Sequence, residues 1–116
     1  MVKKIIITGG LGYIGTELCK IYSGVSWHHN IIVFDNRFIS ERVNQVRNWN
    51  MEFIHGDILD KEVVNRHFKD ADIVHHLAGV TKVPRTKSES NKEIEENIKL
   101  VGEKGTQNIL DAISDK

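Results

Sequence analysis

Three glycines near the start of the sequence, Gly9, Gly12 and Gly15, recur at intervals of three residues. The isoleucine run at residues 5–7 predicts a short buried strand before them, and the apolar spacing after them predicts a helix. The expected apolar face of that helix consists of Ile14, Leu18, Cys19, Ile21 and Tyr22. A glycine turn between a strand and a helix suits a pyrophosphate, because N–H groups and the helix dipole both favour an anion there.

A separate physical reason explains why glycine is expected at each of these three positions. Gly9 lets the chain reverse tightly out of the strand, and Gly12 lets backbone N–H groups approach the pyrophosphate of a dinucleotide. Gly15 lets the new helix pack closely on its sheet. The alternative interpretation is a plain strand–turn–helix in which the glycines serve only the turn.

An acidic residue, Asp35, ends a second apolar run at residues 31–34, about 20 residues after Gly15. A carboxylate at this place can accept hydrogen bonds from the adenosine ribose hydroxyls and repels a 2′-phosphate, so NAD is expected rather than NADP. The alternative role for Asp35 is a helix cap or a turn. Arg37 lies nearby and is interpreted as a solvated loop side chain.

Short apolar runs alternate with helical patterns along the chain, which indicates an α/β fold with a doubly wound parallel sheet. We expect strands at about residues 3–8, 31–34, 51–55 and 71–77, and helices at 12–22, after 40, after 60 and from 92 to near the end. Ser40 and Asp60 are the expected caps of the second and third helices. Right-handed crossovers then give the strand order 3-2-1-4.

In such a sheet the ligand lies beyond the carboxyl ends of the strands, at the switch point between strands one and four. The glycine turn, Asp35, Asp57 and the pair Ala78–Gly79 are all expected at that edge. Four separately placed motifs therefore predict one site.

Composition excludes several classes of function. The chain has 116 residues, suited to one domain, and its formal net charge of zero gives no footprint for nucleic acid or an anionic membrane. Its one cysteine cannot form an internal disulfide, which favours a reducing cytoplasm. The neighbours His75 and His76 point to opposite faces of a strand, and we expect no metal site.

The segment Thr8–Gly15, TGGLGYIG, resembles the TGxxGxxG motif of extended short-chain dehydrogenases/reductases, and within them the NAD-dependent nucleotide-sugar epimerases and dehydratases. Residues 34–36 (FDN), 55–58 (HGDI) and 76–79 (HLAG) follow in that family's order at about its spacings. The resemblance covers nearly the whole chain and implies a Rossmann-type fold, here partial. It also implies that Asp57 and the Ile58 N–H meet the adenine, although a turn role for Asp57 is the alternative.

The candidate cofactor-binding residues are Gly9, Gly12, Tyr13, Ile14, Gly15, Asp35, Asn36, Asp57, Ile58, Leu77, Ala78 and Gly79. Residues 105–110 further resemble the family's GTxNxL segment, with Gly102 where an asparagine commonly stands. Gly102 and Gly105 are explained if this helix presses closely on the sheet or on a partner helix.

The family's chemistry uses a tyrosine with a lysine four residues later. Tyr13 is followed by Glu17 and Tyr22 by Ser26, so no catalytic residue is assigned. We therefore expect residues 1–116 to be the N-terminal portion of an NAD(P)-binding domain, with the catalytic Tyr/Lys segment and the substrate domain absent.

The resemblance implies the NAD-binding part of an oxidoreductase that acts by transient hydride transfer between a sugar hydroxyl and bound NAD. It further implies a nucleotide-sugar substrate in the intact protein and a homodimer. Two alternatives stay open. One is a non-catalytic dinucleotide-binding module, and the other is an NADP-dependent reductase of the same superfamily.

Overall fold

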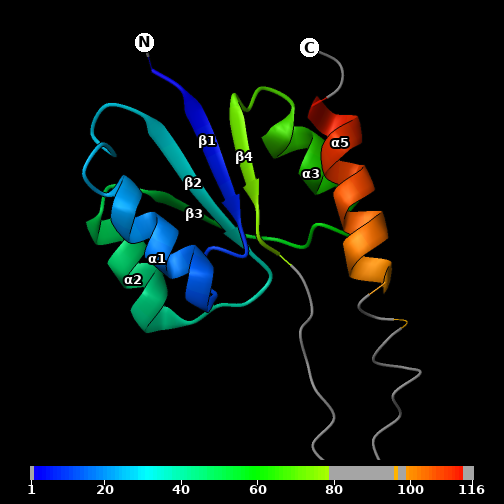
Figure 1. Ribbon diagram of the computed structural model, residues 1–116, viewed down its shortest axis with the longest axis horizontal. Helices are drawn as coiled ribbons and strands as arrows, with labels where there is room; N and C mark the ends of the chain where they lie inside the picture. The colour runs from blue at the N-terminus through cyan, green and yellow to red at the C-terminus, as the bar shows by residue number, and fades with distance from the viewer. Residues whose placement is uncertain (1, 79–95, 97–98, 114–116) are drawn as a thin grey trace, which may run out of the picture.

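The computed structural model describes residues 2–78, 96 and 99–113, and it shows helices packed on both faces of a parallel sheet (Figure 1). Its elements are β1 (Lys4–Thr8), α1 (Tyr13–Tyr22), β2 (Asn30–Asp35), α2 (Ser40–Asn48), β3 (Glu52–His55), α3 (Lys61–Phe68), β4 (Ile73–His76), the π-helical turn η1 (Val101–Gly105) and α5 (Thr106–Ile113). The strands lie within two residues of their predicted bounds. The expected start of the last helix, at residue 92, lies outside the described residues.

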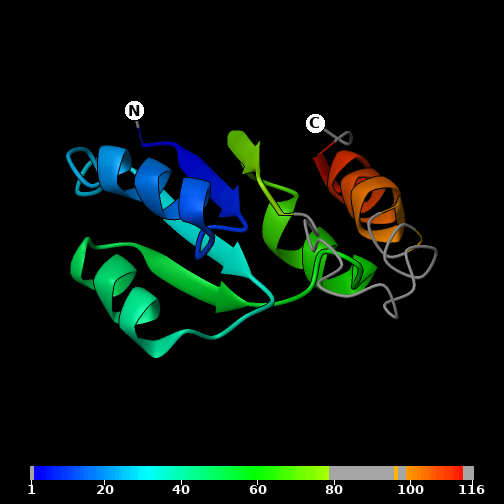
Figure 2. The same cartoon turned by 60° about the horizontal axis from the view of Figure 1, so that its bottom comes forward.

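The sheet has the predicted order, β3-β2-β1-β4, and all its neighbours are parallel. In the centre of the sheet, Ile6 pairs with Ile32 of β2 on one side and with Val74 of β4 on the other. Helices α1 and α2 cover one face, and α3 and α5 cover the other, as the two views show (Figures 1 and 2). The carboxyl ends of the strands therefore meet at one edge.

Alternation along β1 divides the core into two halves. Ile5 and Ile7 pack with Cys19 on the side of α1 and α2, whereas Ile6 packs with Phe68 on the side of α3 and α5. Successive side chains of a strand point to opposite faces, so a strand buried on both faces must be apolar throughout. This is why the isoleucine run predicted a central strand.

The apolar face of α1 is narrower than expected. Cys19 is fully buried, but Ile14 is 69% exposed and Ile21 is 75% exposed. Helical residues are spaced about 100° apart around the axis, so Ile21 lies about 200° from Cys19 and faces away from the sheet. The prediction that both isoleucines belong to the core face is therefore wrong.

One of the two predicted helix caps is confirmed. The Asp60 carboxylate accepts a hydrogen bond of 3.3 Å from the Val63 N–H at the start of α3. Ser40 is instead the first residue of α2, and the capping position is taken by Ile39, which makes no side-chain cap hydrogen bond.

Among the helices that the structure describes, no candidate for a membrane-spanning segment is found, because none combines the length and the apolar character that a span requires.

Candidate functional site

A cavity of about 820 Å³ lies where the strands end, at the edge predicted for a ligand. This volume is in the range of small-molecule and cofactor sites. The predicted residues that line it are Gly9, Gly12, Tyr13, Ile14, Gly15, Asp35, Asn36, Asp57, Ile58, Leu77 and Ala78. Gly79 lies outside the described residues. The structure thus brings four separate segments of the chain to one cavity.

The glycine turn is shaped by close backbone approaches. Gly9 has a φ of 68°, and a Cβ there would lie 2.8 Å from the Ala78 nitrogen. At Gly15 a Cβ would lie 2.6 Å from the Gly10 Cα. Gly15 is therefore required because α1 lies against the turn itself, and not because of the predicted packing on the sheet.

Helix α1 starts directly beside this turn. Gly12 is its N-cap residue and makes no side-chain cap hydrogen bond, and the first turn of α1, which the structure describes in full, holds no acidic residue. The first turn of any helix leaves N–H donors without intrahelical acceptors, and the dipole end is positive. The exposed Tyr13 and Ile14 flank these donors, so the start of α1 offers an anion both hydrogen bonds and a favourable field.

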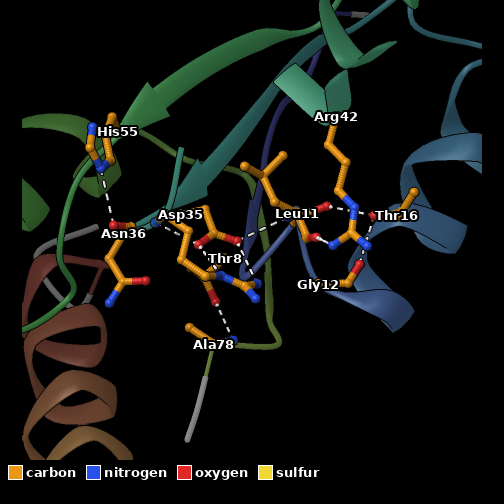
Figure 3. Close-up of polar contacts among 11 residues, drawn as sticks. Thr8, Leu11, Gly12, Thr16, Asp35, Asn36, Arg42, His55 and Ala78 are labelled. Atoms are coloured by element: carbon orange, nitrogen blue, oxygen red, sulfur yellow. Dashed lines mark hydrogen bonds and ion pairs between the residues drawn. The ribbon is translucent and has the colours of Figure 1, made fainter. Parts of the chain in front are cut away.

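The Asp35 carboxylate is buried at the end of β2, and the side chain of Asp35 lies beside Leu11 of the glycine turn (Figure 3). It accepts main-chain hydrogen bonds of 3.0 Å from Leu11 N and from Arg37 N. It also accepts two from the Arg37 guanidinium, at 3.1 Å from Nε and 3.2 Å from Nη2. Arg37 lies in the loop after β2 with a side chain that is 52% exposed, as predicted, but its guanidinium also pairs with a buried carboxylate, which the prediction did not include.

Two contacts that the sequence did not reveal hold the turn in place. The Arg42 guanidinium on α2 donates to the Leu11 carbonyl, and the Thr16 hydroxyl donates to the Gly12 carbonyl at 2.7 Å (Figure 3). The Asn36 main-chain carbonyl accepts a 3.0 Å hydrogen bond from His55 Nε2 on β3. The main-chain carbonyls of Leu11, Gly12 and Asn36 are thus held by side chains from α2, α1 and β3, respectively.

The segment after β3 is held from two directions. The Asp57 carboxylate accepts from the Leu59 N–H at 2.9 Å, a local turn that matches the alternative interpretation of this residue. The Ile58 carbonyl accepts from Asn108 Nδ2 of α5 at 2.8 Å. A Cβ on Gly105 would lie 2.7 Å from the Ile58 Cγ1 atom. Gly105 thus packs closely on this segment and not on the sheet or a partner helix, and the close packing expected at Gly102 is wrong, because an added Cβ there would meet no atom within 4 Å.

The wall after β4 is held by a chain of hydrogen bonds through His76. The Thr8 hydroxyl oxygen accepts from the Leu77 N–H at 3.0 Å. It also accepts from the Ala78 N–H at 3.1 Å (Figure 3). Its lone pairs are then used, so its own proton is donated to His76 Nδ1 at 2.8 Å. His76 Nε2 therefore carries the ring proton and donates to the Thr106 hydroxyl at 2.9 Å.

Burial acts on two titratable groups near this site. Desolvation lowers the pKa of His76 below its ordinary value of 6.5, which agrees with the neutral ring that the hydrogen-bond chain requires. It also raises the pKa of the Cys19 thiol to about 11. Cys19 is fully buried, as predicted. No group of histidine, cysteine or acidic residues suited to a metal ion occurs in the part of the chain that the structure describes.

Comparison with known proteins agrees with this geometry. The 3-beta hydroxysteroid dehydrogenase/isomerase family matches residues 6–116. A dTDP-D-glucose 4,6-dehydratase of Dictyostelium discoideum is 35% identical over 103 residues, covering 84% of this chain and 24% of that protein. A UDP-glucose 4-epimerase of Neisseria meningitidis serogroup C is 31% identical over 103 residues, covering 83% of this chain and 30% of that protein.

Among solved structures, the UDP-glucose 4-epimerase from Brucella ovis in complex with NAD has a TM-score of 0.73 at 25% identity. The match covers 96% of this chain and 32% of that one. This chain thus spans about a quarter to a third of the length of these proteins. The resemblance seen in the sequence is confirmed, and this chain belongs to the 3-beta hydroxysteroid dehydrogenase/isomerase family, with nucleotide-sugar epimerases and dehydratases as its relatives.

Proposed function

We propose that the cavity at the strand ends binds the adenosine and pyrophosphate part of NAD. One observation carries this proposal: a buried carboxylate, Asp35, shares a single cavity with a glycine turn at the start of a helix. A positive helix end suits a pyrophosphate and a carboxylate suits ribose hydroxyls, so the two groups match two neighbouring parts of one dinucleotide. The complex of the Brucella ovis relative with NAD supports the same cofactor.

The residues of the cavity divide among the parts of the cofactor. The turn at Gly9, Gly12 and Gly15, with Tyr13 and Ile14 beside it, would hold the pyrophosphate, because the start of α1 leaves N–H donors without intrahelical acceptors there. Asp35 and Asn36 would hold the adenosine ribose. The Asp57–Ile58 segment would meet the adenine, while Leu77, Ala78 and Gly79 would form the wall beside the cofactor.

The intact protein, in this proposal, is an epimerase or dehydratase that acts on a nucleotide sugar. The names of the curated relatives support that substrate class. When bound, NAD supplies hydride transfer with a sugar hydroxyl, and residues 1–116 supply its binding and orientation. No catalytic residue is assigned here, since neither Tyr13 nor Tyr22 has a lysine four residues later. A homodimer and a cytoplasmic location stay predictions.

Calorimetric titration of the full-length protein with NAD tests the proposal. Asp35→Asn keeps the shape of the side chain but removes its charge, so NAD should bind at least about tenfold more weakly, given about 1.5–3 kcal/mol for a hydrogen bond to a charged group. Glu52→Gln is the matched control, because it removes one negative charge from the exposed start of β3 outside the cavity. Equal NAD affinity in Asp35→Asn and the wild-type protein would contradict the proposal.

A second candidate is an NADP-dependent reductase of the same superfamily. One observation favours it, the Arg37 guanidinium paired with Asp35, because an arginine near this carboxylate can accommodate a 2′-phosphate. Titration with NADP beside NAD separates the two candidates. Preference for NADP would favour the reductase.

A further inference from the structure

The Asp35 carboxylate has no acceptor position left for a ribose. It accepts four hydrogen bonds, two from the main-chain N–H groups of Leu11 and Arg37 and two from the Arg37 guanidinium. The two oxygens of a carboxylate offer about four lone-pair sites. All of them are therefore occupied by the protein's own donors.

The four donors differ in their freedom to leave. Leu11 N belongs to the glycine turn, and the Leu11 carbonyl is held by a hydrogen bond from Arg42. Arg37 N belongs to the backbone directly after β2. The Arg37 side chain, in contrast, is 52% exposed and connects to the backbone through rotatable bonds. The guanidinium is thus the one part of this arrangement that can move away without breaking the turn.

The Arg37 guanidinium also lies inside the proposed cofactor site. Arg37 lines the cavity together with Asp35 and Gly12. A Cβ added to Gly12 would lie 3.3 Å from Arg37 Nη2, so this nitrogen stands between the carboxylate and the glycine turn. A dinucleotide that reached both groups would meet the guanidinium on the way.

We infer that Arg37 competes with the adenosine ribose for Asp35, and that it sets the discrimination between NAD and NADP. The inference rests on the proposed dinucleotide site. Two ribose hydroxyls need two acceptor positions, which is the number that the guanidinium fills. When NAD displaces the guanidinium, Arg37 loses its ion pair with Asp35. The free energy lost with that ion pair offsets part of the binding free energy of NAD.

NADP alters that exchange. Its 2′-phosphate is repelled by Asp35 but offers the displaced guanidinium a new anionic partner, and arginine pairs with phosphate through a planar fork of donors. Arg37 thereby weakens NAD binding and strengthens NADP binding through the same movement. The wild-type protein should accordingly bind both nucleotides, with a smaller preference for NAD than Asp35 alone would give.

Calorimetric titration of the full-length protein with NAD and with NADP tests the inference. Arg37→Gln should bind NAD up to about fivefold more tightly, as expected for release of a partly exposed ion pair. It should bind NADP about tenfold more weakly, because a charge-assisted contact with phosphate is lost. Arg47→Gln is the matched control, since it removes an exposed arginine from the last turn of α2 outside the cavity.

Arg37→Lys gives a second measurement, which applies even if the glutamine variant unfolds. Lysine keeps the positive charge but lacks the fork, so NADP binding should fall less than in the glutamine variant while NAD binding still improves. Equal weakening of both nucleotides in the Arg37 variants, or an unchanged NAD-to-NADP ratio, would overturn the inference and leave the proposed site standing. Absence of binding of either nucleotide to the wild-type protein would overturn both.

Discussion

The side-chain amide of Asn108 donates a buried hydrogen bond of 2.8 Å to the main-chain carbonyl of Ile58, fifty positions earlier in the chain. Gly105 lies one helical turn before Asn108 and contacts the Ile58 side chain. Gly105 of η1 and Asn108 of α5 thus fix both the side chain and the backbone of Ile58. The segment proposed to meet the adenine is therefore positioned by η1 and α5 together.

Replacing Asn108 with leucine should lower the free energy of unfolding by about 1–3 kcal/mol, because the buried Ile58 carbonyl would lose its donor. Urea denaturation followed by circular dichroism measures the change. Gln107→Ala on the exposed side of the same helix is the control and should stay within about 0.5 kcal/mol of the wild type. An equal effect of both substitutions would show that the hydrogen bond contributes nothing specific.

The two glycines of η1 should respond oppositely to alanine. Gly105→Ala places a Cβ 2.7 Å from Ile58 Cγ1 and should destabilise the protein by about 1–3 kcal/mol. Gly102→Ala meets no atom within 4 Å and should be neutral or stabilising by up to about 1 kcal/mol. Thermal denaturation of both variants provides the comparison.

A double-mutant cycle identifies the cause of the Gly105 effect. Ile58→Val shortens the side chain that the new methyl group would meet, so it should cost less in the Gly105→Ala background than in the wild type. Additive effects would mean that Gly105 is needed for the π-helical backbone and not for contact with Ile58.

Acid should weaken the fold through His76. Its pKa is lowered in the folded protein by burial, so the unfolded chain binds the proton first as the pH falls. The free energy of unfolding should therefore decrease as the pH drops from about 7 through the unfolded pKa of about 6.5, until the folded-state pKa is passed. Urea denaturation midpoints measured from pH 7 downward test whether the free energy of unfolding falls as the pH is lowered.

Two variants, His76→Asn and His76→Gln, test whether the His76 ring causes this pH dependence. His76→Asn keeps an acceptor for the Thr8 hydroxyl, and His76→Gln keeps a donor for Thr106. Both should flatten the pH dependence relative to the wild type, since neither titrates. A slope that persists unchanged in both variants would show that His76 is not its source, and a His76 ring that titrates above its ordinary value by NMR would contradict the lowering of its pKa by burial.

The sequence predicted the sheet because its signals are local or follow from topology. Apolar runs such as residues 5–7 identify strands buried on both faces, and the handedness of crossovers then orders them. The same topology brings Asp35 and the glycine turn to one cavity. Ile14 and Ile21 were misplaced because hydrophobicity alone does not say which apolar residues a short helix leaves exposed.

The residues that the sequence did not reveal share a different property. Arg42 binds a carbonyl 31 positions away and Asn108 binds one 50 positions away. A polar side chain that contacts distant backbone leaves no periodic or capping pattern near its own position. The pairing of Arg37 with Asp35 is local, but its direction depends on the bend after β2, which residue types alone do not determine.

The central position of β1 has a consequence for how the domain is made. Thr8 meets its β4 partner His76 across 68 positions, whereas Leu11 meets Asp35 across only 24. Closing the longer loop costs more entropy, and distant pairings form slowly. A chain leaving the ribosome can therefore join the turn to Asp35 while the wall at residues 77–78 is still unsynthesised. The turn and Asp35, which form the pyrophosphate and ribose side of the cavity, can thus be in place before the wall that completes it.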